Sequence, residues 1–579
     1  MAVQLTSYTR ETPVGALSPQ RFLESLLQPA APDRDRRVAL AGKSGKEWEE
    51  TTYATLDDRS RRLARLLIEL GVHAGDHVAV VGESSPDWVV AFLAVLRAGA
   101  VAVPLDAKLT PHELRPILED ARPVAVLCSR SVHDSVGRLF EEVPSVHAVL
   151  PWPYPPSQSR AAGEVTSPRV MSDTALIVYT SGTTGRSKGV TLSYANLAHQ
   201  VRCATRLQRL TGRERFLSIL PLSHTFELSC GLLSPLATGG QVNYSGSLLP
   251  DEIAAAMAER QVTGMVVVPL FLKLLKTGIE RKLARAPRAS RLVLQSAGVL
   301  ADAVPRPSVR RVAYAPLLRK FGGRLRVFYV GGAPLDLDVA EYFVRMGISV
   351  YQGYGLTETS PIVAMNAPAA NRLGSVGRPL PDVEVRIDTD VVAPAGEGAV
   401  LVRGPNVMLG YHCDAEATRA TIDADGWLDT GDLGHSDADG FLWITGRSKN
   451  VIVLANGKNV QPEEVEHVLE QSTLVREVCV LGRAATGGLA DGSEEVHAVV
   501  VPTDDAKASR TGEELQALME AEVRNLTQRL ATYKHPRTIT VWTHELPKTA
   551  TRKVKRTEVG ALLAKATSHR AATSRQGNP

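Results

Sequence analysis

The segment Tyr179–Val190, YTSGTTGRSKGV, combines small hydroxylated residues, glycines and a lysine directly after a β-branched apolar run. Such residues let a backbone curl until several N–H groups point at one spot, a nest for phosphate oxygens, and Lys188 adds a point charge. We interpret the segment as a phosphate-binding loop. Its spacing is not that of the Walker A loop, because two residues separate Gly185 from Lys188. The alternative interpretation is an ordinary linker rich in Ser, Gly and Thr.

A second glycine-rich turn, GYGLTETS at Gly353–Ser360, follows the strand-like run ISVYQ. Glu358 offers a hard carboxylate that suits Mg²⁺ held against phosphate oxygens. Tyr354 offers an aromatic ring on which a purine could stack. Taken alone, a glycine-rich turn with one glutamate is equally consistent with a structural role.

A third pair of turns carries polar residues suited to a sugar. Asp432, in LDTGDLG, could accept hydrogen bonds from ribose hydroxyls, and Arg447, in ITGRSKN, could donate others. Either residue could equally be an ordinary surface residue in a turn.

Strand-length apolar runs alternate with helical patterns such as PDWVVAFLAVLRAG from residue 77 to about 352, and the first two turns directly follow strand-like runs. Unalternating β-branched runs separated by helices indicate buried parallel strands, so the predicted fold class is α/β. The predicted strands are HVAVVG, AVAVP, PVAVLC, TALIVY, FLSIL, TGMVVV and LRVFYVG.

Other segments have a different character. Residues 151–169 are rich in Pro and Ser and predict an exposed loop. Alternating segments within 374–411 predict antiparallel strands. The last 19 residues are small and polar, and we expect them to fray. A smaller module after residue 411 has the expected strands ITGRSKNVIVL, VREVCVLG and EVHAVVVP and expected helices near Glu463–Gln471 and Gly512–Arg529.

The composition, 44% hydrophobic and 22% charged residues over 579, is that of a globular protein of several folding units. No apolar run approaches the roughly 18 residues that a membrane span needs, and the N-terminus shows no secretory signal. The five cysteines form no C-x-x-C pair. We therefore expect a cytoplasmic protein with buried thiols.

Positive charge is concentrated in one segment. Residues 281–326 contain twelve Lys or Arg and one acid, a balance of +11, so the rest of a chain of net charge +4 carries −7. Such a segment suits an anionic partner, namely a phosphate, an acidic carrier protein or a lipid headgroup. The alternative is a solvated arginine-rich insertion.

Together the motifs are more specific than any one of them. YTSGTTGRSKGV, GGAPL, YGLTETSP, TGDLG, GRSKN and PKTATRKVKR occur in the order and at the approximate separations typical of the adenylate-forming superfamily, which the chain resembles over residues 20–560. The resemblance implies a large N-terminal domain, residues 1–448, with two parallel-sheet lobes and a β-rich subdomain. It also implies a smaller mobile α+β C-terminal domain, residues 449–579.

The resemblance also implies a role for individual residues. Asp432 and Arg447 are implied to hold the ribose, Thr357 and Glu358 to contact phosphate and Mg²⁺, and Thr184 to be a second metal contact. The triphosphate is implied to bind Thr180, Ser181, Gly182, Thr183, Thr184, Gly185 and Lys188, and the adenine to lie among Gly332, Ala333, Pro334, Gly353, Tyr354 and Gly355.

Lys553 occupies the place of the superfamily's C-terminal catalytic lysine. Such a lysine would lie between the attacking carboxylate and the α-phosphate and neutralise charge there. Arg552 departs from the usual glycine before that lysine, so Lys555 and Lys548 are alternative candidates.

The implied reaction has two halves in one site. A carboxylate attacks the α-phosphate of ATP, pyrophosphate leaves, and a thiol then displaces AMP from the acyl-adenylate. The small domain is expected to rotate about Lys449 between the halves. Gly457 lies where related enzymes line a pantetheine tunnel with backbone. The implied cofactors are ATP, Mg²⁺ and coenzyme A, or the phosphopantetheine of a carrier protein.

PLSHTFEL, residues 221–228, resembles the acyl-pocket segment of medium- and long-chain fatty acyl-CoA synthetases, with His224 beside the acid. The histidine could instead be structural. Glu227 is interpreted as an ion-pair or hydrogen-bond residue, and only superficially echoes the aspartate that meets an amino acid's ammonium group. The basic insertion between about residues 276 and 326 also resembles long-chain enzymes, in which this region is associated with substrate entry and membrane contact.

We therefore expect an ATP-dependent fatty acid–CoA ligase of medium to long chain. An alternative is a fatty acyl-AMP ligase that loads an acidic acyl carrier protein. A third possibility is a non-catalytic nucleotide- or acyl-binding protein, but Lys188, Glu358, Asp432, Arg447 and Lys553 are all retained. We expect no nucleic-acid partner and allow peripheral membrane contact through the basic segment.

Overall fold

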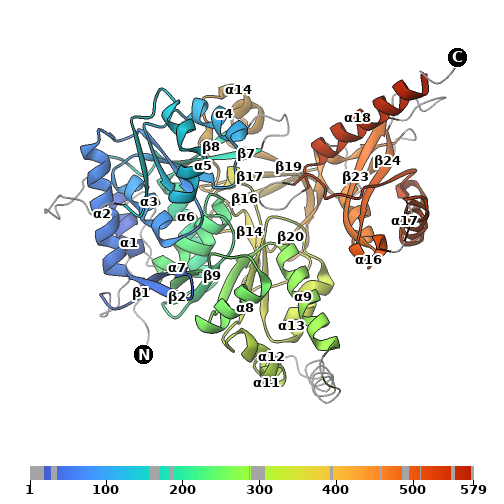
Figure 1. The fold of residues 1–579 in the computed structure, drawn as a ribbon, viewed down its shortest axis with the longest axis horizontal. Coiled ribbons are helices and arrows are strands. Elements are labelled where there is room, and N and C mark those ends of the chain that lie inside the picture. Colours follow the sequence, from blue (N-terminus) through green and yellow to red (C-terminus); the bar gives the residue numbers. More distant parts are fainter. Residues whose placement is uncertain are drawn as a thin grey trace. The chain divides into compact units, whose positions relative to one another are not determined.

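The computed structural model forms two compact units, unit 1 comprising Met1–Glu384 and Val402–Leu428 and unit 2 comprising Val385–Leu401 and Asp429–Pro579 (Figure 1). The domain boundary expected at residue 448 stays a prediction. The structure describes residues 18–27, 35–154, 168–181, 187–285, 287, 307–391, 396–454, 459–484, 494–508, 510, 512–548 and 554–575.

Unit 1 contains a seven-stranded sheet in which five strands are parallel and two, at one edge, are antiparallel. In spatial order the strands are β18 (Gly410–Tyr411), β8 (Ser187–Ser193), β7 (Thr174–Ser181), β4 (Val101–Asp106), β3 (His77–Gly82), β5 (Ala125–Ser129) and β6 (Ala148–Trp152). The hairpin β7–β8 therefore brackets the predicted phosphate loop.

A nine-stranded sheet forms the other lobe of unit 1, with parallel strands at its centre and antiparallel strands at both edges. In spatial order the strands are β15 (Arg378–Pro379), β14 (Ala364–Met365), β13 (Ser349–Tyr354), β12 (Val327–Val330), β11 (Gly264–Val267), β9 (Arg215–Ser218), β10 (Gln241–Tyr244), β1 (Val38–Ser44) and β2 (Glu47–Thr52). The seven predicted strands are all found, and the α/β fold is confirmed. The lobes are mixed sheets rather than wholly parallel ones, because short connections return the chain at their edges.

The helices of unit 1 begin where the sequence supplies caps. Ser85 accepts a hydrogen bond from the Trp88 N–H at the start of α3, and Thr110 and Glu113 form a capping box on α4. The helices are α1 (Pro19–Leu27), α2 (Tyr53–Glu69), α3 (Pro86–Arg97), α4 (Pro111–Ala121), α5 (Arg130–Glu141), α6 (Tyr194–Leu207), α7 (Ser234–Ala237), α8 (Pro250–Glu259), α9 (Pro269–Ala284), α11 (Pro307–Ala313), α12 (Ala315–Leu318), α13 (Leu337–Arg345) and α14 (Ala415–Thr421), with a π-helix at Glu227–Leu233. Helix α3 is buried from Trp88 to Arg97, which explains the apolar run from Trp88 to Leu96.

Unit 2 contains most of a four-stranded sheet, a two-stranded ribbon and a three-stranded sheet with helices. The strands are β16 (Glu384–Asp388), β17 (Gly398–Arg403), β19 (Leu428–Ser436) and β20 (Leu442–Arg447), then β21 (Ile452–Val453) and β22 (Asn459–Val460), then β23 (Val475–Ala484), β24 (Glu494–Pro502) and β25 (Thr538–Val541). Its helices are α15 (Pro462–Leu469), α16 (Asp504–Lys507), α17 (Gly512–Thr527) and α18 (Arg556–Arg575).

Three sequence expectations are wrong in part. The loop expected at residues 151–169 begins later, because β6 pairs with β5 and buries Trp152; residues 155–167 lie outside the described residues. The run ITGRSKNVIVL is not one strand, since Ser448–Asn450 form a 3₁₀ turn. The expected frayed end belongs to α18 as far as Arg575, consistent with the high helix propensity of its alanines.

The basic segment is partly neutralised within the fold. The Arg311 side chain donates to the carbonyls of Gly323 and Leu325, and Arg326 forms two hydrogen bonds with the buried Glu214 carboxylate. Residues 288–306 lie outside the described residues. Among the helices that are described, none combines the length and apolar character needed to cross a membrane.

Candidate nucleotide and acid site

The predicted phosphate loop joins the two strands of a hairpin. Thr180 pairs with Lys188 in the antiparallel register of β7 and β8, and Ser181 pairs with Ser187. The hairpin therefore holds Thr180 and Lys188 at one end of the sheet. Gly182, Thr183, Thr184 and Gly185 lie outside the described residues, so the role of Thr184 as a metal contact stays a prediction.

The predicted adenine-binding turns lie at one edge of the nine-stranded sheet. Strands β12 and β13 are parallel neighbours, with Val330 opposite Gln352, so the segments that leave their carboxyl ends emerge together. The first segment contains the exposed residues Gly332, Ala333 and Pro334, and the second contains Gly353, Tyr354, Gly355, Thr357 and Glu358. This edge is where ligands bind open α/β sheets.

Glycine is needed at Gly355 because the turn folds back on itself. A Cβ there would overlap the Pro361 carbonyl oxygen and lie 3.0 Å from the Thr359 hydroxyl oxygen. The same Thr359 hydroxyl accepts from the Leu356 N–H at 2.9 Å and so closes the turn. The turn therefore has no space for a side chain at this point.

The backbone of the Glu358 turn is fixed by buried polar groups from other elements. The Gln200 side-chain amide donates to the Thr359 and Ile362 carbonyls, at 3.1 and 3.0 Å, and the Ser360 hydroxyl donates to the Asn406 carbonyl. The Met408 N–H donates to the Glu358 carbonyl at 2.9 Å. Buried hydrogen bonds of this kind rigidify the turn, which leaves the Glu358 carboxylate on a fixed support.

Tyr411 connects the two predicted phosphate-site residues Lys188 and Glu358. Its hydroxyl donates to Glu358 Oε1 at 3.0 Å, and the Lys188 Nζ lies 4.7 Å from the centre of its ring. Burial, and secondarily the Glu358 carboxylate, raises the pKa of Tyr411, so the hydroxyl keeps its proton and is the donor. Sequence reasoning missed Tyr411; its only signal was its place in a Gly-Tyr pair after a strand-like run.

His224 follows β9 at the same carboxyl edge of the sheet as Gly332. Its backbone N–H donates to the Pro221 carbonyl, and its side chain is half-buried. Two residues later the ring of Phe226 packs on Gly331, where a Cβ would lie only 3.0 Å away. The structure thus brings the segment predicted to contact the acid next to the segment predicted to contact adenine.

Glu227, interpreted from the sequence as an ion-pair or hydrogen-bond residue, forms no ion pair among the described residues. It begins a π-helix and is 1% exposed, and no described residue forms a hydrogen bond of good geometry with either carboxylate oxygen, although the nearby Ser218 hydroxyl partly offsets the effect of burial on its pKa. Burial raises its pKa to about 8, which makes the neutral acid its main form at pH 7. Gly231, one helical turn later, leaves the space that the carboxyl group occupies.

In unit 2 the two predicted ribose contacts pair with each other. Arg447 Nε donates to Asp432 Oδ1 at 2.6 Å, across the β19–β20 register in which they are partners. Asp432 is buried, whereas Arg447 is exposed. The pair therefore presents an orientated acid and an accessible guanidinium, and their contact with ribose stays a prediction.

The predicted residues for the second half-reaction are only partly described. The backbone of Lys449 forms the middle of the 3₁₀ turn Ser448–Asn450, while Gly457 and Lys553 lie outside the described residues. The alternative lysines are engaged elsewhere: Lys548 forms an ion pair with Glu477 at 2.5 Å, and Lys555 forms one with Glu558 at 2.9 Å. The assignment of the catalytic role to Lys553 stays a prediction.

The available oxygens fit Mg²⁺ that arrives with a nucleotide. Glu358 is a half-buried carboxylate with one hydrogen bond to a described residue, which leaves it able to bind a hard cation. Among the described residues, no three His, Cys, Asp or Glu side chains form a cage for a metal. One protein carboxylate is sufficient when phosphates and water supply the remaining ligands.

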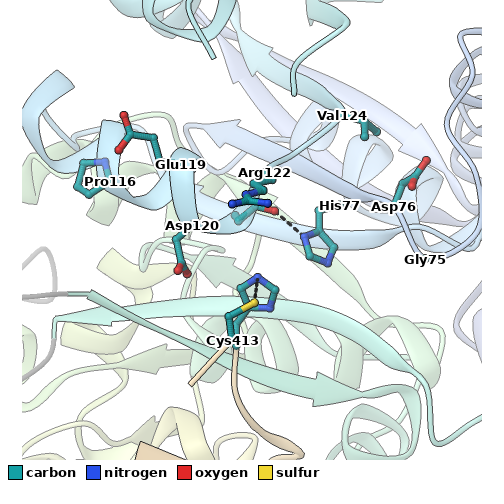
Figure 2. A pocket seen from close by; sticks show the side chains of 11 residues that line it. Gly75, Asp76, His77, Pro116, Glu119, Asp120, Arg122, Val124 and Cys413 are labelled. Atoms are coloured by element: carbon teal, nitrogen blue, oxygen red, sulfur yellow. Dashed lines mark hydrogen bonds between the residues drawn. The ribbon is translucent and has the colours of Figure 1, made fainter. Parts of the chain in front are cut away.

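A separate pocket of about 580 Å³ lies in unit 1 around His77, His412 and Cys413 (Figure 2). The two imidazole rings are 5.2 Å apart in an edge-on arrangement, and Cys413 Sγ lies 3.5 Å from His412 Nε2. Its lining includes Asp120 but none of the described residues predicted to bind nucleotide. Within the described part of the chain, this pocket and the predicted site therefore share no residue.

Comparison with known proteins identifies the family. The model of the AMP-binding enzyme matches residues 27–412, and the model of the AMP-binding enzyme C-terminal domain matches residues 464–553. The chain is 33% identical over 468 residues to the long-chain-fatty-acid–CoA ligase FadD15 of Mycobacterium bovis, which covers 76% of each chain. It is 32% identical to the indoleacetate–CoA ligase of Aromatoleum aromaticum, over 92% of this chain and 98% of that one.

A solved structure agrees with this assignment. The O-succinylbenzoate coenzyme A synthetase of Bacillus subtilis, in complex with ATP and a magnesium ion, matches with a TM-score of 0.70 and 27% identity over 93% of this chain and 98% of that chain. The fold and the predicted resemblance define an AMP-forming acyl-CoA ligase that acts through an adenylate. The chain belongs to the AMP-binding enzyme family.

Proposed function

We propose that this chain activates a medium- to long-chain fatty acid as acyl-AMP and transfers the acyl group to coenzyme A. The observation that carries the adenylation half is the convergence of Lys188, Tyr411 and Glu358 beside the glycine-rich turns. A lysine and a carboxylate that lie close together without pairing suit a metal-bound triphosphate, because the lysine can bind phosphate and the carboxylate can bind the metal.

The proposal assigns these steps to the chain. A carboxylate oxygen attacks the α-phosphorus of ATP, and the bond to the pyrophosphate oxygen breaks. Lys188 binds phosphate oxygens and Lys553 neutralises charge between the acid and the α-phosphate. Mg²⁺ bound with the nucleotide would neutralise further phosphate charge beside Glu358. A thiol sulfur then attacks the acyl carbon, AMP leaves with the oxygen of the broken C–O bond, and the thiol proton is lost to solvent.

One observation supports a fatty acid as the substrate, and a second argues against an amino acid. The first is the similarity to the mycobacterial ligase named for long-chain fatty acids. The second is the state of Glu227, because a buried acid with a pKa of about 8 is a poor counter-ion for the ammonium group of an amino acid. An apolar tail gains about 0.8 kcal/mol for each CH₂ that it buries.

The proposal has two conformations. The C-terminal part rotates about Lys449, presenting Lys553 for adenylation and the segment that contains Gly457 for the thiol. A holo acyl carrier protein is the alternative acceptor, since its phosphopantetheine carries the same thiol as coenzyme A.

We also propose peripheral contact with an anionic membrane through α9, α11 and the basic 281–326 segment. Leu274 is 62% exposed and Val312 is 76% exposed, and both lie close in sequence to lysine and arginine side chains. Apolar side chains flanked by basic ones favour the surface of anionic lipid. Flotation with vesicles containing phosphatidylserine should recover the wild type and lose Leu274→Glu; equal recovery of both argues against the contact.

Acid-dependent pyrophosphate exchange tests the substrate. The enzyme with Mg²⁺ and ATP is offered fatty acids of six to eighteen carbons, indoleacetate, ferulate and amino acids, and exchange should be fastest with the fatty acids. In a second step, coenzyme A and a holo carrier protein are supplied separately to preformed acyl-AMP. Faster exchange with an aromatic acid overturns the fatty-acid assignment. If the holo carrier protein consumes acyl-AMP and coenzyme A does not, the assignment of coenzyme A as the acceptor is overturned.

A further inference from the structure

Tyr411 lies between two groups of opposite charge that the reaction needs separately. Lys188 Nζ lies over the face of its ring, 4.7 Å from the centre, and Glu358 accepts from its hydroxyl at 3.0 Å. Among the described residues, Lys188 forms no ion pair, although its ring neighbour bonds a carboxylate. A lysine side chain is long and flexible enough to reach a nearby carboxylate unless something holds it elsewhere.

We propose that Tyr411 is a positioning residue that keeps Lys188 and Glu358 from pairing with each other, so that Lys188 stays available to phosphate and Glu358 to the metal. This inference rests on the proposed adenylation function but not on which acid is used. The ring face attracts the ammonium group, and the hydroxyl at the ring's edge orients the carboxylate. One side chain therefore serves both groups at once.

The backbone around Tyr411 fixes where the ring lies. Strand β18 pairs with β8, placing Tyr411 opposite Val190, and the His412 N–H donates to the Gly189 carbonyl at 2.7 Å. On its other side, the Tyr411 N–H donates to the Thr418 hydroxyl at 2.9 Å. Because side chains alternate along a strand, Lys188 and Val190 share a face of β8, and the ring of Tyr411 lies along that face.

The Glu358 end of the arrangement is equally constrained. The Met408 N–H, three residues before Tyr411, donates to the Glu358 carbonyl, so one short segment holds both the backbone and the side chain of Glu358. Because the backbone on both sides of Tyr411 is fixed, its ring can determine the distance between Lys188 and Glu358. A mobile side chain at the same place could not.

Two substitutions separate the two contacts. Tyr411→Phe keeps the ring beside Lys188 and removes the hydroxyl that orients Glu358. Tyr411→Leu removes both contacts and lets Lys188 and Glu358 approach each other. His412→Ala is the matched control, because His412 directly follows the end of β18 and its ring lies in the separate pocket with His77.

Binding of ATP is measured by calorimetry, without acid, once in EDTA and once across a magnesium titration. For Tyr411→Phe, we expect ATP affinity in EDTA within twofold of wild type and about a tenfold rise in the half-saturating Mg²⁺ concentration, the loss expected for a hydrogen bond to a charged group. For Tyr411→Leu, we expect affinity in EDTA also to fall about threefold or more, as for a lost cation–π contact. His412→Ala should match wild type in both.

A double-substitution cycle with Glu358→Gln adds a second readout. If Tyr411 acts through Glu358, Tyr411→Phe should change the magnesium dependence little once Glu358 is replaced, so the two effects are not additive. The proposal is overturned if Tyr411→Phe leaves the magnesium dependence unchanged, or if it lowers affinity in EDTA as much as Tyr411→Leu. Thermal unfolding identifies a Leu variant that does not fold, in which case the Phe variant and the cycle decide.

These binding measurements are distinguishable from a failure of the proposed function. If the wild type binds MgATP but activates no fatty acid, the proposed substrate is wrong. The role of Tyr411 is still tested in full by the binding measurements. A wild type that binds no ATP under any condition overturns both.

Discussion

Replacing Gly355 by alanine tests whether the closed turn positions Glu358. The added Cβ would overlap the carbonyl oxygen of Pro361 and come within 2.9 Å of its carbonyl carbon, so backbone atoms rather than a flexible side chain must move. Forced overpacking of this kind destabilises a protein by about 1–3 kcal/mol. Glu358 lies three residues further along, and a displacement of about 1 Å at such a group costs about 10²-fold in rate.

Gly353→Ala is the matched control, because it makes the same chemical change two residues earlier. Its Cβ would lie 3.4 Å from the Ala364 carbonyl oxygen and 3.5 Å from Met365 Cβ, which are ordinary contacts. We expect urea unfolding at pH 7 to show the loss of stability for Gly355→Ala only. Pyrophosphate exchange at saturating ATP and acid should fall by about 10- to 100-fold for Gly355→Ala and by less than threefold for Gly353→Ala. If the two variants are equal in both assays, the steric argument for Gly355 is refuted.

Three further outcomes are expected. Lys553→Ala should suppress adenylation strongly while transfer from preformed acyl-AMP to coenzyme A is largely kept, and equal loss of both half-reactions in single-turnover assays would show that the division of labour is wrong. Lys449→Pro fixes φ near −65°, so it should spare pyrophosphate exchange and slow thioester formation; undiminished thioester synthesis counts against the hinge. Glu227 has a folded pKa of about 8, above its ordinary 4.5, so the folded state binds more protons than the unfolded state between these values and wild-type stability falls as pH rises from 5 to 8, by up to about 1.4 kcal/mol per pH unit. Glu227→Gln removes this slope, and a urea midpoint difference between variant and wild type that is the same at pH 5 and pH 8 would contradict the buried acid.

The strands were predictable because burial on both faces leaves a strong pattern. HVAVVG at 77–82 coincides with β3, and LRVFYVG contains β12. Unbroken β-branched runs in a chain with short connections are typical of parallel strands that are buried on both faces. The shortest antiparallel edge strands were not predictable, since β14, β15 and β18 each have two residues and no periodicity can show in so short a segment.

The candidate site was predictable only where it is local. The glycine-rich turns can be recognised in the sequence because each tight turn needs several small residues close together in the chain. Asp432 and Arg447 were each found from their turns, yet their mutual ion pair depends on the β19–β20 register, which joins residues 15 apart. The state of Glu227 was missed for a related reason, because its burial depends on how a π-helix packs, and nothing in PLSHTFEL shows that.

Tyr411 shows why such sites need a fold before they can be understood. Its two contacts are with residues that precede it by 223 and 53 positions, and no pattern within the chain links those separations. What links them is topology: β18 returns along the outer edge of β8, while the segment just before it holds the Glu358 turn through Met408. Since phosphate and metal must be bound by opposite charges in close proximity, a fold that brings those charges together must also keep them apart. An aromatic ring with a donor at its edge meets both requirements, which is why we expect substitutions at Tyr411 to change nucleotide and magnesium binding separately.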